Sequence, residues 1–362
     1  MNNNTKKGSG ILGGLIFLVV GIVILWSNEG RTVKTQSAIL EAENNYIQVK
    51  SDKINSKNDG KLVATKGKII ADSLDELKDD IFGINVKAVK LRRVVEMYQW
   101  EEECEEDDNN NTKCTYEKVW NSKLLDSSEY HESGHNNPSD MPYESEEYIS
   151  DNVKLGSFVL PEELIKKLKY DKKKTNDNLV NEYNNSKEEI KVDGKYLTNV
   201  KENNPEIGDI RISFEYTPSK SVSVMGVQTD DTFEAYTSKK GKDIYTIVEG
   251  NKTGTQMLEN MKSANKFIKW VLRFVGTILI ISSISAMFST ITRIFGQIPV
   301  IGSVVNSATS IVSSVLGIGL SLIIISVAWF RFRPLLSIGL IGAAILLLVL
   351  LKFMKTNKEE TK

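Results

Sequence analysis

The chain has 362 residues, a formal net charge of −1 and charged side chains at 26% of its positions. This balance of charge does not favour nucleic acid as a partner, and we expect none, because no nucleic-acid-binding motif is present either. The hydrophobic fraction of 41% averages two unlike parts, since the apolar residues gather near the two ends of the chain. The long middle segment, 27–266, is strongly polar. The sequence therefore indicates an integral membrane protein with a large aqueous domain.

The first apolar run, 8–26, follows a short tail at 1–7 and carries no charge. A helix needs roughly 20 apolar residues to cross a hydrocarbon core, where only its own hydrogen bonds satisfy the backbone. Trp26 stands where an interfacial aromatic residue is expected. Lys6 and Lys7 precede the run, as in a secretory signal peptide, but no small-residue cleavage site follows it. We therefore predict a retained anchor.

The apolar residues from Phe267 onward predict three further spans. One uncharged stretch in this region is too long for a single helix, and Pro299 and Gly302 interrupt its beginning. The expected segments are span 2 at 267–292, a loop or re-entrant segment at 293–310, span 3 at 311–330, span 4 at 334–351 and a lysine-rich tail at 352–362. The fold class is thus a multispanning α-helical membrane protein with four spans, one N-terminal and three C-terminal, and both termini on one side.

The aqueous domain, 27–266, is expected to be an α+β domain rich in strands. Residues 210–216 alternate cleanly between apolar and polar, which is the pattern of a half-buried strand. A capping box at Ser73–Glu76 predicts a short helix through Ile81, and Pro161 predicts another at its first turn. The stretch 171–192 is too polar for a core. Further strands are expected at 61–70, 86–100, 222–227 and 243–248.

The side of the membrane on which this domain lies is not decided by the lysines and arginines, which flank the spans on both faces. Cys104 and Cys114 are the only cysteines, and they stand on either side of an acidic, Asn-rich tip between two strand-like arms. A disulfide between them would persist only in a lumen or outside the cell. Asn-x-Ser/Thr sequons occur at Asn110, Asn184 and Asn251. We therefore expect a luminal or extracytosolic domain and a candidate disulfide.

Several short motifs, each present once, follow one another along most of the chain, from about residue 10 to 350. Their residues are Asn28, Glu29, Gly30, Arg31, Arg92, Arg93, Glu96, Tyr98, Trp100, Gly134, His135, Asn137, Pro138, Gly208, Asp209, Arg333 and Pro334. Their order, together with the one-plus-three layout of the spans, resembles the transmembrane protein 43 family, also called LUMA. Charge-dense insertions at 101–113 and 171–189 distinguish this chain from the pattern.

The resemblance implies a multi-pass protein of the endoplasmic reticulum membrane and inner nuclear membrane, with the large domain luminal. It implies a non-enzymatic scaffold that self-associates, as a homo-oligomer in the lipid bilayer, and organises membrane protein complexes of the nuclear envelope. Lamin- and emerin-type proteins are partners by resemblance only. Of these partners, the lamins are the ones that the resemblance implies least strongly for this chain. No catalytic activity and no cofactor are expected.

An alternative, enzymatic reading rests on His131-Glu132-x-x-His135, which matches the zinc-binding H-E-x-x-H pattern. On a helix this spacing places two imidazoles on one face, with the glutamate as general base. The flanking residues are polar and turn-like, however, and the third ligand would have to be a carboxylate, since the chain has only two histidines. Candidates for that ligand are Glu144, Glu146 and Glu147. A structural role for His135 in a loop is the favoured reading, so we expect no metal.

A second alternative is a lipid- or solute-handling protein that uses the Gly- and Ser-rich C-terminal bundle. Its serines would line a groove open to lipid; they are Ser282, Ser283, Ser285 and Ser289. No span carries a central ionisable residue, which is the usual mark of an ion pathway.

Beside the first span, Glu29 and Arg31 are expected to pair with each other or with Arg331 or Arg333. Arg92 and Arg93 in an apolar strand indicate internal ion pairs or a headgroup contact. The acidic run 101–108 lacks EF-hand spacing and is read as a solvated hairpin tip.

Overall fold

The computed structural model describes residues 6–106, 112–171, 183, 187, 189–201, 204–295, 302–335 and 337–338. The chain divides into two compact units. We call Met1–Asn44, Thr237–Ile244 and Leu258–Lys362 the helical unit, and Asn45–Tyr236 with Tyr245–Met257 the strand-rich unit. Each unit is described by itself.

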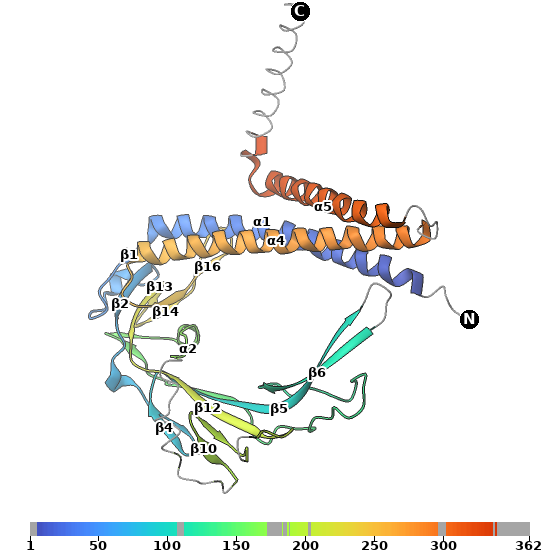
Figure 1. Ribbon diagram of the computed structural model, residues 1–362. Helices are drawn as coiled ribbons and strands as arrows, with labels where there is room; N and C mark the ends of the chain where they lie inside the picture. The colour runs from blue at the N-terminus through green and yellow to red at the C-terminus, as the bar shows by residue number, and fades with distance from the viewer. Residues whose placement is uncertain are drawn as a thin grey trace, which may run out of the picture. The chain divides into compact units, whose positions relative to one another are not determined.

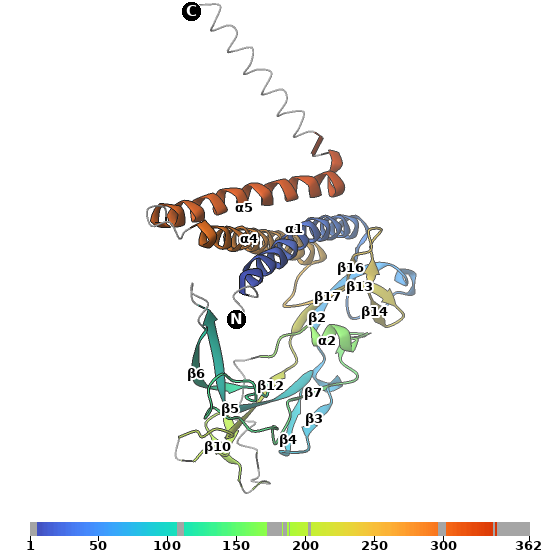
Figure 2. The same ribbon diagram turned by 90° about the vertical axis from the view of Figure 1, so that its right-hand side faces the viewer.

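The helical unit is built from three long helices: α1 (Lys6–Asn45), α4 (Gly254–Phe295) and α5 (Gly302–Phe332). Helices α1 and α4 lie side by side, and α5 packs along them (Figures 1 and 2). Each contains a stretch long and apolar enough to cross a membrane, within Leu12–Asn45, Gly254–Phe288 and Val312–Phe332. A membrane protein with these three candidate spans among the described residues therefore agrees with the expected class.

The helices differ in length from the predicted spans. Helix α1 does not end with its apolar run at Trp26 but continues to Asn45, and α4 starts at Gly254, before its apolar part. Helix α5 begins at Gly302, so much of the segment 293–310, expected as a loop or re-entrant piece, is helical; 296–301 lie outside the described residues. The predicted span 4 at 334–351 lies outside them too, apart from its first few residues.

Small residues let the helix backbones approach closely. A Cβ on Gly276 of α4 would lie 2.7 Å from a methyl carbon of Leu25 on α1, and one on Gly317 of α5 would lie 2.5 Å from Ile281 on α4. The hydroxyl of Ser283 donates to the carbonyl of Gly14 at 2.6 Å. Because lipid supplies no hydrophobic drive between helices, such close packing and hydrogen bonds hold spans together. These glycines therefore fix the spacing of the three helices.

Two sheets form the strand-rich unit (Figure 1). The first contains β1 (Ile47–Gln48), β2 (Leu62–Lys68), β13 (Ser221–Thr229), β14 (Thr232–Glu234) and β17 (Thr246–Glu249). The second contains β5 (Lys90–Glu106), β6 (Thr112–Asn121), β7 (Glu146–Ile149), β10 (Lys191–Asp193), β11 (Tyr196–Thr198) and β12 (Ile210–Thr217). Strands β5 and β6 make a long hairpin that extends beyond its sheet (Figures 1 and 2).

Shorter elements complete the two units. They are η1 (Ser56–Asn58), η2 (Ala71–Ser73), α2 (Glu162–Lys166) and the strand pairs β3 (Glu76–Asp79) with β4 (Ile84–Lys87), β8 (Lys154–Leu155) with β9 (Phe158–Val159) and β15 (Tyr236–Thr237) with β16 (Asp243–Ile244).

Each sheet of the strand-rich unit covers its own hydrophobic core. In the first, Phe158 stacks on Phe233 with ring centroids 4.8 Å apart. In the second, Ile212 and Phe214 of β12 point inward, and Phe214 packs edge-on against Phe82. The alternation of β12 was predicted from its sequence, since apolar residues two apart share one face of a strand.

Two expectations for this unit were wrong. The helix predicted after Ser73 is absent. The hydroxyl of Ser73 donates to the carbonyl of Ile70, three residues earlier, and strand β3 begins at Glu76. The stretch 171–192 is not wholly surface either, because Tyr183 and Ile190, among its few described residues, are buried in the second core.

Candidate functional site

The motif after the first span forms the polar centre of the helical unit. Glu29 on α1 is fully buried, and a buried carboxylate is costly unless it is paired and hydrogen-bonded. The guanidinium of Arg273 on α4 donates to it at 2.7 Å, and the indole N–H of Trp329 on α5 donates at 3.0 Å. One carboxylate thus joins all three helices. We call this group, with Asn28, Arg31 and Asn265, the polar junction.

The neighbours of Glu29 extend the junction along α1 and α4. The amide of Asn28 donates to the carbonyl of Lys269 at 3.0 Å, and Arg31 donates to the side chain of Asn265 at 2.9 Å. Asn265 in turn donates to the carbonyl of Thr32 at 3.1 Å. The predicted pairing of Glu29 and Arg31 with each other, or with arginines at the end of α5, is therefore wrong.

The pairing was missed because sequence gives no register between residues 244 positions apart on two helices. The isolated Arg273 at the start of an uncharged stretch was nevertheless a usable signal. Gly30 has a steric role in the same motif: a Cβ there would lie 2.8 Å from the ring of Phe332 on α5. Phe332 also packs edge-on against Trp26, with centroids 5.8 Å apart. These aromatics mark the level at which the apolar part of α1 ends.

A second set of family-motif residues forms a buried ion-pair cluster in the strand-rich unit. Arg93 on β5 is only 2% exposed; it forms an ion pair with the fully buried Asp79 and donates to Glu146 at 2.9 Å. The hydroxyl of Tyr148 lies 2.8 Å from Glu146 and 3.1 Å from Asp79. Burial raises the pKa of Tyr148, so it remains a hydrogen-bond donor. We call these four residues the Arg93 cluster.

The other motif arginine and glutamate of β5 point elsewhere. Arg92 forms an ion pair with Glu215 on the neighbouring strand β12. Glu96 accepts two hydrogen bonds from Arg211 on β12, at 2.7 and 3.0 Å. Cross-strand ion pairs therefore account for this part of the motif. Of the two roles expected for Arg92 and Arg93, internal ion pairs explain these contacts without a lipid headgroup.

Three motifs that are distant in sequence meet around β5. The backbone N–H of Trp100 donates to the side chain of Asn137 at 2.7 Å, and the Asn137 amide donates back to the Trp100 carbonyl at 2.8 Å. The backbone N–H of Tyr98 donates to the carbonyl of Asp209 at 2.8 Å. Gly208, with φ of +96°, lies against Pro138, so a side chain there would be strained and crowded. Asn137 thus continues the strand ladder with a side chain.

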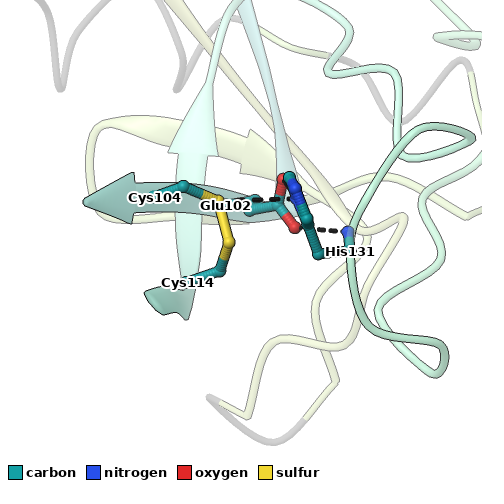
Figure 3. A group of neighbouring side chains, drawn as sticks. All are labelled: Glu102, Cys104, Cys114 and His131. Atoms are coloured by element: carbon teal, nitrogen blue, oxygen red, sulfur yellow. Dashed lines mark hydrogen bonds and ion pairs between the residues drawn. A yellow bond between two sulfur atoms is a disulfide. The ribbon is translucent and has the colours of Figure 1, made fainter. Parts of the chain in front are cut away.

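Figure 3 shows the group around the β5–β6 hairpin: Glu102, Cys104, Cys114 and His131. The two cysteines face each other across the hairpin and form a disulfide. Glu102 accepts hydrogen bonds from the hydroxyl of Tyr116 at 2.6 Å and from the backbone N–H of His131 at 2.6 Å. These donors, that of Tyr116 first, lower the pKa of the Glu102 carboxyl from its ordinary value of 4.5.

The geometry does not fit the zinc motif. Residues 131–135 form a bend and a turn, not a helix, so the two imidazoles do not share a helix face. His131 contacts Glu102, whereas His135 stacks on Tyr116 with centroids 3.8 Å apart. Glu102, His131 and the two cysteine sulfurs do lie close together, within 4.8 Å of one another. The sulfurs are bonded to each other, however, and a disulfide is not the thiolate that zinc requires.

The serines of α4 do not line an open groove where the structure describes them. Ser283 is buried and bonds to α1, whereas Ser282 is exposed and Ser285 half-buried. Ser289 belongs to α4 as well. The close packing of α4 against α1 at Ser283 argues against the lipid- or solute-handling alternative. Arg333 and Pro334 follow α5 and line a hollow beside α1.

Three apolar helices joined by a buried polar junction, and a separate strand-rich unit, define a multi-pass membrane protein with a strand-rich domain between its first and second candidate spans. Comparison with known proteins makes the assignment specific. Residues 97–334 match the family described as Transmembrane protein 43, and the chain belongs to that family.

Relatives match across most of their length. Human Transmembrane protein 43 is 28% identical, over 94% of this chain and 89% of its own, and that of Rattus norvegicus is 28% identical over 91% and 86%. The Transmembrane protein 43 homolog of Drosophila melanogaster is 28% identical over 93% of this chain and 91% of its own. No solved structure matches the chain. The family expected from the sequence motifs is thus confirmed.

Proposed function

We propose that this protein is a non-enzymatic membrane scaffold that self-associates through the exposed face of α5. The observation that carries the proposal is Gly319, which lies on α5 and has no described atom from elsewhere in the chain within 4 Å of the position of a Cβ. Its neighbours on this face, Val315 and Leu322, are 65% and 59% exposed. A small residue on an apolar helix face lets a second helix approach closely in lipid, as the packed Gly317 does within the unit.

The polar junction supports a scaffold role because it makes the helical unit rigid. A buried carboxylate that binds groups from two other helices opposes sliding of any one helix. A rigid unit presents its outer face in a fixed geometry, so less ordering entropy is lost when another membrane protein binds. The partners that we propose are a second copy of this chain and, by family resemblance, other membrane proteins of the nuclear envelope.

The proposed location is the endoplasmic reticulum and inner nuclear membrane, with the strand-rich unit luminal. The location rests on the family resemblance. The orientation is supported by the Cys104–Cys114 disulfide, since disulfides persist in oxidising compartments and are rare in the cytosol. Thiol labelling of sealed microsomes tests it: the two cysteines should react with an impermeant reagent only after detergent and reductant are added. Labelling in intact, cytoplasmic-side-out vesicles without either would reverse the proposed orientation.

Self-association is tested by single-molecule photobleaching of the labelled full-length protein in lipid nanodiscs. We expect more than one copy per particle for the natural sequence and a shift toward single copies for Gly319→Ile. Gly13→Ile is the matched control, because Gly13 of α1 also has open space around it but lies on another helix. An equal effect of both changes would exclude α5 as the interface, and single copies of the unchanged chain would exclude self-association.

A further inference from the structure

Two neighbouring hollows follow α1 beyond Trp26, where its apolar run ends. The first has a volume of about 380 Å³ and is lined by Gly30, Lys34, Lys242 and Phe332, among others. The second, of about 450 Å³, lies along the next turns of α1 and is lined by Val33, Leu40, Lys240, Arg333, Pro334 and Leu335, among others. All of these residues belong to the helical unit. We call the two hollows together the basic trough.

Four of the basic residues that line the trough have no carboxylate partner among the described residues. Lys34, Lys240, Lys242 and Arg333 line it, and none of the four forms an ion pair with a carboxylate in the part of the chain that the structure describes. By contrast, Lys262 of α4 pairs with Glu43, and Arg273 pairs with Glu29. No carboxylate of the described residues therefore neutralises these four charges, and this favours an anion as the ligand of the trough.

A tight turn holds two of these cations in place. The backbone N–H of Gly241 donates to the carbonyl of Ser238 at 2.8 Å, and that of Ser238 donates to the carbonyl of Lys242 at 3.1 Å. The turn is attached to α1, because the backbone N–H of Lys239 donates to the carboxylate of Glu41 at 3.1 Å. Lys240 and Lys242 thus sit on a backbone that needs no ligand to order it, which favours binding by preorganisation.

The remaining wall of the trough is apolar and exposed. Leu335 is 85% exposed and Leu40 is 47% exposed, and Pro334 stands between Leu335 and Arg333. An acidic peptide or a free phosphate needs no such wall. A phospholipid does, because its glycerol and first acyl carbons are apolar while its phosphate is anionic. The position also fits, since Trp26 and Phe332 are aromatic residues of the kind that gather at a membrane–water interface.

We propose that the basic trough binds one anionic phospholipid, with Lys240 and Arg333 on its phosphate and the glycerol region against Leu40 and Leu335. Basic pockets between membrane helices are suited to anionic headgroups, and each Lys or Arg near the surface contributes about 1 kcal/mol toward an anionic membrane. The inference concerns a ligand of the monomer and does not depend on the proposed self-association through α5.

The test is native mass spectrometry of the full-length protein in detergent, titrated with phosphatidylserine or with phosphatidylcholine of the same acyl chains. We expect one phosphatidylserine per chain to bind preferentially. Changing Lys240→Ala and Lys242→Ala together should weaken its binding about thirtyfold, and Arg333→Gln about fivefold. Two matched controls, Lys239→Ala in the same turn and Arg331→Gln at the end of α5, remove charges that line neither hollow and should change binding less than twofold.

Three outcomes would overturn the proposal. Equal binding of the two lipids would remove the headgroup charge from the recognition. Equal losses in the control variants would indicate a diffuse basic surface instead of a built site. Displacement of phosphatidylserine by an equal concentration of glycerol phosphate would make the ligand a soluble phosphate. Each variant is first checked by its thermal unfolding, because exposed lysines on a closed turn should leave the fold intact.

Discussion

Glu29 on α1 accepts a hydrogen bond at 3.0 Å from the indole nitrogen of Trp329 on α5, a residue 300 positions away in the sequence. The same carboxylate holds Arg273 of α4. A single buried charge near the N-terminus therefore joins two helices from the C-terminal part of the chain. In the sequence, the strands of the strand-rich unit lie between α1 and α4.

The junction predicts a strong effect of Glu29→Gln on stability. The change leaves the Arg273 guanidinium buried without its counter-charge, and breaking one side of a buried pair costs about 3–5 kcal/mol. We expect a lower midpoint of thermal unfolding for the full chain in detergent. Glu43→Gln is the control: its pair with Lys262 is about one-third exposed on both sides, and such pairs contribute about 1 kcal/mol or less.

A double variant separates the ion pair from packing. Glu29→Leu with Arg273→Met should lose less stability than the sum of the two single changes, because neither charge is then left alone. Equal midpoints for Glu29→Gln and Glu43→Gln would mean that the buried carboxylate does not hold the helices together.

The two neighbouring arginines of β5 provide a matched pair for the strand-rich unit. Arg93 is 2% exposed and faces the fully buried Asp79, whereas the Arg92 side chain is 40% exposed. We expect Arg93→Met to lower the free energy of unfolding by about 3–5 kcal/mol and Arg92→Met by less than about 1 kcal/mol. Urea unfolding of the full chain, followed by hydrogen exchange of peptides from β5 and β12, measures both. Similar losses would show that burial of the pair at Arg93 has no special weight.

Local pattern carried much of this architecture. The apolar runs predicted the cores of α1, α4 and α5, and alternation at Ile210, Ile212 and Phe214 predicted β12, because both depend on burial of a repeating face. The capping box at Ser73 misled, since a serine that bonds backward to Ile70 is equally compatible with a turn before a strand.

Apart from the Cys104–Cys114 pair, the site residues were predictable as motifs but their partners were not. Cys104 and Cys114 stand directly opposite in β5 and β6, a relation that the symmetric arms of a hairpin already indicated. The partners of Glu29 are 244 and 300 positions away, and those of Arg93 lie on the other strands β3 and β7. The register between such elements cannot be read from one sequence. The basic turn at Lys240 and Lys242 was missed for the same reason, because the sequence does not show which residues surround a charged loop in the fold.

Removing the disulfide should loosen the hairpin without unfolding the unit. Cys104 and Cys114 are 10 positions apart, and a disulfide across a short loop contributes about 2–3 kcal/mol, mainly by limiting the unfolded chain. Neither cysteine belongs to the two hydrophobic cores. We expect Cys104→Ser with Cys114→Ser to speed hydrogen exchange in peptides from β5 and β6, and to leave exchange in β2 and β13 unchanged. Faster exchange across both sheets would contradict a local role.

The carboxyl of Glu102 predicts a pH dependence at the same hairpin. Its pKa in the folded chain is lowered from 4.5, first by the hydroxyl of Tyr116 and then by the donors of His131. The unfolded loop therefore binds more protons than the folded one between the two pKa values. By linkage, the contact between the loop that contains His131 and the β5–β6 hairpin is fully stabilised above pH 4.5. This contact weakens as the pH falls through the lowered pKa of Glu102.

Hydrogen exchange of a peptide that covers 129–137, measured as pH is lowered and corrected for the intrinsic rate, checks this prediction. The natural chain should lose protection in that window. Glu102→Gln should be less protected at neutral pH and show no step, because an amide cannot titrate. Glu101→Gln, a change at the exposed neighbour, should keep the step. A step that survives Glu102→Gln would assign the titration to another group, and absence of a step in the natural chain would show that Glu102 does not hold the loop.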